Sequence, residues 1–190
     1  MRRKADELLL AWRDNPNRKP LLVKGVRQSG KTFLLRTYAQ NVFDSVVYVN
    51  LENDRSARAD FSAGLDPHVI VRAIEARTGQ RIIPGRTLLF IDEIQACEEA
   101  LTSLKYFCED APEYLVASAG SLLGVAINHR SHSFPVGKTD LIEMAPLDFE
   151  EFLWAMGREA LADEIRSCFE AMSPLAPSLH DEAISLYRQY

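Results

Sequence analysis

Residues 25–32 read Gly25-Val26-Arg27-Gln28-Ser29-Gly30-Lys31-Thr32 and match the pattern G-x-x-x-x-G-K-[ST] at every fixed position. A short apolar run at residues 20–23 precedes them and predicts a buried strand, and residues 32–39 have the spacing of a helix. Backbone N–H groups in such a loop wrap a phosphate, because the glycines carry no intruding side chain and the helix N-terminus adds partial positive charge. The stretch therefore predicts a strand, a phosphate-binding loop and a helix, in that order.

The residues of this glycine-rich loop (residues 25–32) have separate expected roles. The predicted nucleotide contacts are Gly25, Val26, Arg27, Gln28, Ser29, Gly30, Lys31 and Thr32. Lys31 is expected to reach the β- and γ-phosphates as a point charge, and the Thr32 hydroxyl is expected to ligate Mg²⁺. Lys31 is therefore a catalytic candidate as well as a binding one.

A second motif follows at Leu88-Leu89-Phe90-Ile91-Asp92-Glu93, where four apolar residues lead into two carboxylates. This is a Walker B pattern. Asp92, at the end of a buried strand, is expected to hold Mg²⁺, and Glu93 is expected to orient and polarise the attacking water. The two motifs together predict ATP and Mg²⁺ as the bound groups.

Apolar patterning alternates between the strand and helix periods along the chain. Strands are predicted at residues 20–23, 45–51, 87–91, 114–118 and 138–144, and helices at residues 5–12, 32–39, 67–78, 100–108, 149–156, 161–169 and 181–190, with a polar stretch at 52–60 and an interruption at 173–178. This alternation predicts an α/β fold with a mainly parallel five-stranded sheet between two helical layers. We expect an N-terminal helix and linker at 1–19, a P-loop core at 20–145 and a helical extension at 146–190.

Composition excludes several classes of protein. The chain has 190 residues with 47% hydrophobic and 26% charged, which is typical of a globular domain, and a net charge of −5, which is unlike a generic nucleic-acid coat. The three cysteines form no C-x-x-C pair, and no apolar run approaches the roughly 18 residues of a membrane span. We expect a cytoplasmic protein with reduced thiols and no membrane contact.

Polar residues after the fourth predicted strand are candidates for sensing the γ-phosphate. Ser118 and Ser121 both qualify, with Ser121 favoured, and Gln95 is a weaker candidate for contacting water or phosphate. Arg130, in a polar loop beyond them, is a candidate for an arginine that stabilises phosphoryl transfer from a neighbouring subunit. A solvated surface arginine remains the alternative for Arg130.

The motifs GVRQSGKT, LLFIDEIQ and AGSLLG together resemble a group of uncharacterised prokaryotic AAA+ P-loop ATPases. Further matching segments are LKYF at 104–107, FPVGK at 134–138 and PL with FEEFL between 146 and 153, so the resemblance extends over almost the whole chain. The resemblance implies a sheet of the additional-strand arrangement. It also implies a separate C-terminal domain of unknown role, which we expect to be missing from this sequence.

Other nucleotide-dependent classes fit less well. The segment Gly137-Lys138-Thr139-Asp140 resembles the guanine-reading motif of GTPases only superficially, since glycine occupies its first position. A small-molecule kinase is disfavoured because Asp92-Glu93 suits water activation and no arginine-rich lid is evident. A DNA-binding role finds no readable motif in these residues.

The sequence thus predicts an ATP-binding, probable Mg²⁺-dependent ATPase domain that couples nucleotide state to conformation or assembly. The expected partners are ATP, a second copy of the chain in a homo-oligomer, or an unknown protein. The alternative is a regulatory switch that binds ATP without hydrolysing it, against which the carboxylate of Glu93 counts.

Overall fold

A computed structural model describes residues 2–121 and 137–190 of the chain. Within them, one parallel sheet has the strand order β2-β3-β4-β1-β5. The strands are β1 (Leu21–Gly25), β2 (Ser45–Asn50), β3 (Thr87–Asp92), β4 (Leu115–Gly120) and β5 (Asp140–Met144). Because β4 lies between β1 and β3, the sheet has the additional-strand arrangement, and the predicted α/β class and strand number are confirmed.

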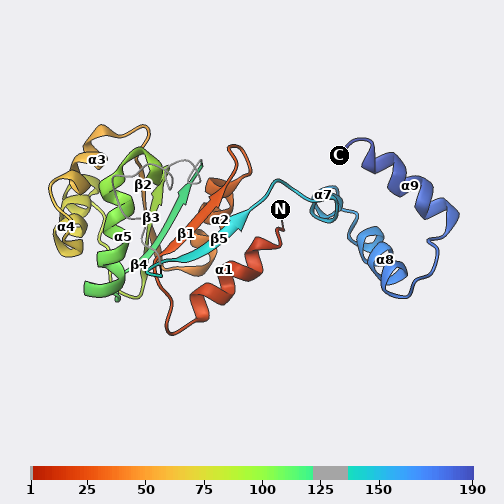
Figure 1. Ribbon diagram of the computed structural model, residues 1–190, viewed down its shortest axis with the longest axis horizontal. Coiled ribbons are helices and arrows are strands. Elements are labelled where there is room, and N and C mark those ends of the chain that lie inside the picture. Colours follow the sequence, from red (N-terminus) through yellow and green to blue (C-terminus); the bar gives the residue numbers. More distant parts are fainter. Residues whose placement is uncertain (1, 122–136) are drawn as a thin grey trace.

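Helices cover both faces of this sheet (Figure 1). Helices α1 (Ala5–Asp14) and α2 (Lys31–Val42) pack on one face, and α3 (Arg55–Ser62), α4 (Pro67–Thr78) and α5 (Glu98–Asp110) pack on the other. Along β3, Leu88 and Phe90 contact the first layer, whereas Leu89 and Ile91 contact the second. Burial on both faces explains why this strand is apolar at consecutive positions instead of alternate ones.

Helix α3 lies where the sequence predicted only a polar stretch at residues 52–60. The helix begins after Asp54, whose side chain accepts a hydrogen bond from the Ala57 N–H at 3.0 Å, and it buries Ala57 and Phe61 completely. Two buried side chains in so short and charged a helix leave no clear apolar periodicity. The N-cap carboxylate, a strong local signal for a helix start, was the feature that could have revealed it.

The C-terminal helices form a separate small core. Helices α7 (Phe149–Ala155), α8 (Glu159–Glu170) and α9 (Pro177–Tyr187) lie beyond β5, at the opposite end of the molecule from α3 and α4 (Figure 1). Their buried residues are Leu153, Trp154, Leu161, Ala162 and Ala183. Helix α9 starts earlier than predicted because Pro177, which we expected to interrupt the helix, occupies its first turn, where a missing N–H costs nothing.

Among the described residues, no helix combines the length and the apolar composition needed to cross a bilayer.

Gly25, the last residue of β1, is required by a close approach between strands. It is the register partner of Met144 in β5, and a Cβ atom at position 25 would lie 2.2 Å from the Met144 carbonyl oxygen. That separation is far inside van der Waals contact, and the atom it meets belongs to the backbone. Any side chain at position 25 therefore forces β1 and β5 apart at the point where the glycine-rich loop begins.

We predict that Gly25→Ala lowers the free energy of unfolding by about 2 kcal/mol or more, as overpacking against fixed backbone does. Gly64→Ala is the matched control, because a Cβ atom there would meet nothing within 4 Å. Urea unfolding of both variants and the wild type measures the difference. Equal stability of the two variants would contradict the steric account.

Candidate functional site

The glycine-rich loop passes from β1 to the first turn of α2 through two residues with left-handed backbone conformation. These are Gln28, with φ of +64°, and Gly30, with φ of +87°. Gly30 is the N-cap of α2 and offers no capping side chain, so the first N–H groups of the helix have no side-chain acceptor at this position. A helix N-terminus of this kind favours an anion.

The side chain of Lys31 folds back into the loop. Its Nζ donates hydrogen bonds to the carbonyl oxygens of Gly25 at 3.0 Å and Val26 at 2.7 Å, and the residue is only 7% exposed. Burial lowers the pKa of Lys31 below its ordinary value, and the negative charges of Glu93 and Asp92 oppose that shift. The ammonium group thus satisfies the loop carbonyls in the absence of any ligand.

Thr32 and Asp92, both predicted metal ligands, are in direct contact. The Thr32 hydroxyl lies 3.0 and 3.2 Å from the two carboxylate oxygens of Asp92, which is 2% exposed at the end of β3. A hydroxyl and a carboxylate are the hard oxygen donors that Mg²⁺ prefers, and Mg²⁺ commonly takes only one or two protein ligands beside phosphates and water. The donor set therefore fits Mg²⁺ bound together with a nucleotide.

Tyr48 of β2 also contacts Asp92 and was not singled out from the sequence. Its hydroxyl donates to Asp92 Oδ2 at 2.8 Å and accepts from Asn50 Nδ2 at 3.2 Å. Burial raises the pKa of Tyr48, and its hydrogen bond to Asp92 acts in the same direction. The Arg36 guanidinium lies 5.0 Å from the centre of its ring, on the other side of this contact network.

The second carboxylate of the motif, Glu93, is held by Gln95. Glu93 has a φ of +50°, and its Oε2 accepts a hydrogen bond from Gln95 Nε2, which lies 3.4 Å from Ser121 Oγ. Ser118, by contrast, is fully buried and donates to the Leu21 carbonyl at 2.8 Å, so its hydroxyl is used within the sheet. Of the two serines considered, the structure places Ser121 beside Glu93.

The arginine candidates lie away from these contacts or outside the described residues. Arg27 is exposed and makes only a 3.4 Å ion pair with Glu52. Arg130 falls between the described ranges, so the structure gives no account of it.

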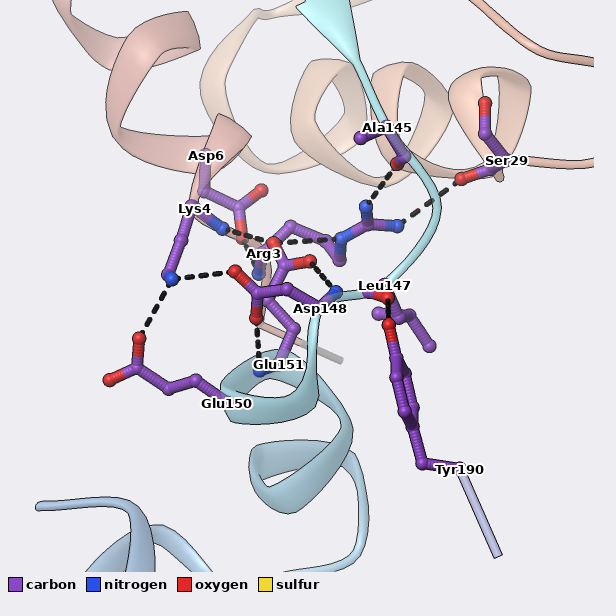
Figure 2. A network of polar contacts seen from close by, with 10 residues as sticks. All are labelled: Arg3, Lys4, Asp6, Ser29, Ala145, Leu147, Asp148, Glu150, Glu151 and Tyr190. Carbon is purple, nitrogen blue, oxygen red and sulfur yellow. Dashed lines mark hydrogen bonds and ion pairs between the residues drawn. The ribbon is translucent and has the colours of Figure 1, made fainter. Parts of the chain in front are cut away.

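A cavity of about 490 Å³ adjoins the loop. Its lining comes from the N-terminal segment, the loop, the residues after β5 and the C-terminus: Arg3, Gln28, Ser29, Gly30, Pro146, Leu147, Phe152 and Tyr190. Arg3 is 6% exposed and ion-paired with buried Glu151 of α7 (Figure 2). Neither residue stood out in the sequence, because an arginine near the N-terminus and a glutamate in a helix are ordinary surface residues in most chains.

The sheet order, with the glycine-rich loop between β1 and α2, defines a P-loop ATPase of the AAA+ type. A family model described as an AAA domain matches residues 17–153, and the chain belongs to that family. Among curated proteins, no sequence matches the chain.

Solved structures share this fold at low sequence identity. The Walker-type ATPase PABY2304 of Pyrococcus abyssi has a TM-score of 0.55 at 15% identity over 97% of this chain and 62% of its own. The Aeropyrum pernix ORC2 protein, solved as ADPNP-ADP complexes, has a TM-score of 0.54 at 14% identity over 97% and 68%. AMPPCP-bound DnaA from Aquifex aeolicus has a TM-score of 0.50 at 13% identity over 96% and 57%.

These likenesses show the fold alone. The chain spans between 57% and 68% of the length of these structures.

Burial of Lys31 predicts a particular pH dependence of stability. Because its pKa is lower in the folded than in the unfolded protein, the unfolded chain binds more protons between the two values, and stability rises with pH across that window. Urea unfolding at about pH 7 and about pH 10 should show the wild type gaining stability relative to Lys31→Met as the pH rises.

Lys4→Met is the matched control for this measurement. The pKa of Lys4 is raised by its hydrogen bonds to Asp148 and Glu150, so its contribution is lost only above the ordinary lysine range. Its difference from the wild type should stay constant up to about pH 10. A constant difference for Lys31→Met as well would contradict the assignment of a lowered pKa.

Proposed function

We propose that the chain binds ATP and hydrolyses it in an Mg²⁺-dependent reaction, using Lys31, Thr32, Asp92 and Glu93. The observation that carries this proposal is the contact between Thr32 and Asp92 beside the loop that holds Lys31, with Glu93 next to it at the end of β3. Membership of the AAA domain family and the nucleotide complexes of structures with this fold support it.

Each side chain has a chemical task that its position suits. The Lys31 ammonium would exchange its contacts with the Gly25 and Val26 carbonyls for the β- and γ-phosphate oxygens. Thr32 and Asp92 would hold Mg²⁺, which when bound neutralises charge on the phosphates. Glu93, released from Gln95, would orient a water molecule and accept its proton, with Ser121 beside it as a candidate contact to the γ-phosphate.

The cavity beside the loop is the proposed place of the nucleotide base. It is continuous with residues 28–30, and the Phe152 and Tyr190 side chains and the apolar Pro146 and Leu147 line it. Aromatic and aliphatic walls with a few polar groups are typical of sites that take a planar ring. Because these residues follow β5, binding there would link nucleotide state to the position of α7, α8 and α9, in keeping with a coupling of nucleotide to conformation or assembly.

The decisive experiment compares ATP binding and turnover by the wild type, Lys31→Ala and Glu93→Gln with Mg²⁺ present. We expect Lys31→Ala to lose affinity, and Glu93→Gln to bind ATP while hydrolysing it at least about 100-fold more slowly. A specific rate that rises with protein concentration would indicate a site shared between copies. Binding without turnover by the wild type would favour the non-hydrolysing switch, and absence of binding would refute the nucleotide assignment.

Tyr48 should tune the metal site through Asp92. Removing its hydroxyl in Tyr48→Phe frees one carboxylate oxygen of Asp92 from a 2.8 Å hydrogen bond, so the carboxylate is less well oriented toward Mg²⁺. We expect the Mg²⁺ concentration for half-maximal ATP binding to rise about tenfold, with metal-free nucleotide affinity unchanged.

Tyr38→Phe is the control for Tyr48→Phe. It also removes a buried tyrosine hydroxyl, which donates to the Leu9 carbonyl at 2.9 Å and does not contact Asp92. Equal Mg²⁺ requirements of the two variants would show that Tyr48 has no specific effect on the metal.

A further inference from the structure

The guanidinium group of Arg3 joins three segments that are distant in sequence. Its Nη1 donates to the Ser29 carbonyl at 3.2 Å, its Nη2 donates to the Ala145 carbonyl at 2.9 Å, and its Nε lies 3.0 Å from Glu151 Oε1 (Figure 2). Both members of this ion pair are about 95% buried. A buried cation with so many specific contacts fixes the relative positions of the groups that it touches.

The contact with Ser29 bears on the phosphate-binding surface of the loop. The peptide bond between Ser29 and Gly30 is planar and trans, as no described peptide bond is cis, so its C=O and N–H point in opposite directions. Holding the Ser29 carbonyl toward Arg3 therefore turns the Gly30 N–H away from Arg3. Gly30 is the N-cap of α2, so this N–H stands among the donors available to an anion at the helix N-terminus.

Glu151 is itself fixed by two further hydrogen bonds. Its Oε1 accepts from the Lys4 N–H at 2.8 Å, and its Oε2 accepts from the Asp148 N–H at 3.1 Å. The second bond is half of a capping box that starts α7. The carboxylate that neutralises Arg3 therefore belongs to the first turn of the C-terminal helices.

We propose that the Arg3–Glu151 ion pair is a positioning device that presets the glycine-rich loop for phosphate, by fixing the Ser29–Gly30 peptide from its outer side. The inference rests on the proposed function. Arg3 acts here through the loop backbone and touches no phosphate. In consequence, α7 and the N-terminal segment take part in determining nucleotide affinity although neither carries a residue of the two sequence motifs.

The test measures dissociation constants by calorimetry on the full chain, for ATP and for inorganic tripolyphosphate, both with Mg²⁺. Tripolyphosphate has no base, so it reports on the loop alone. We expect Arg3→Gln to weaken both ligands by the same factor, about tenfold or more, because the peptide loses a charged hydrogen-bond donor. Arg3→Lys, which keeps the charge but cannot donate to two carbonyls in a planar fork, should weaken both ligands by a smaller factor.

Glu151→Gln extends the test to the ion pair. Glutamine preserves the capping box but removes the charge, so α7 still starts at the same place. We expect it to weaken both ligands, and we expect the double variant Arg3→Gln, Glu151→Gln to bind no worse than Arg3→Gln alone, since the two residues act as one unit.

Arg77→Gln is the control for a general loss of stability. Arg77 is likewise paired with carboxylates, those of Asp54 and Asp60 at 2.8 Å, but on the face of the sheet that α3 and α4 cover. We expect this variant to lower the melting temperature while leaving both dissociation constants within twofold of the wild type.

Three outcomes would overturn the inference. One is wild-type tripolyphosphate affinity in both Arg3 variants; another is an equal loss of affinity in Arg77→Gln. Weakening of ATP alone would show that Arg3 contacts the base instead of positioning the loop. A wild type that binds neither ligand would refute the proposed function itself, a result distinct from all three.

Discussion

The parallel sheet imposes the constraint on which the whole site depends. Parallel strands all end at the same edge, and in this chain β1 ends in the glycine-rich loop, β3 ends at Asp92 and β4 ends one residue before Ser121. Tyr48 and Asn50 come from the end of β2, the register neighbour of β3. Every group of the candidate site therefore reaches one edge without any strand departing from regular pairing, which is the general reason that such folds bind ligands there.

Buried charge at this edge is compensated locally in two separate places. Lys31 has the loop carbonyls as acceptors and the nearby carboxylates of Asp92 and Glu93, and Arg3 has Glu151. Leaving any one of these groups without its partner would place an uncompensated charge in a poorly solvated environment, at a cost that exceeds most single hydrogen bonds. The loop is thus held between two charged clusters, one on its inner and one on its outer side.

The sequence predicted most of the fold because its signals were local. The glycine-rich loop, the apolar run before Asp92 and the strand and helix periods each depend on a few neighbouring residues. Ser121 could not be separated decisively from Ser118, since the choice depends on which hydroxyl the sheet already uses. Tyr48 escaped notice because its role comes from the register of β2 against β3, and Arg3 and Glu151 because their pairing joins opposite ends of the sequence. Helix α3 was missed for the opposite reason, since its few buried residues leave too weak a pattern.

Lys31 gives the loop its own internal occupant. While its ammonium group lies on the Gly25 and Val26 carbonyls, an incoming anion must compete with contacts that the protein already makes. A chloride or a single inorganic phosphate offers too few oxygens or charges to repay that exchange, whereas a polyphosphate chain engages the lysine and the helix N-terminus together. The folded-back lysine therefore acts as a selectivity barrier, which keeps the small anions abundant in any cell from filling a loop shaped for a larger ligand.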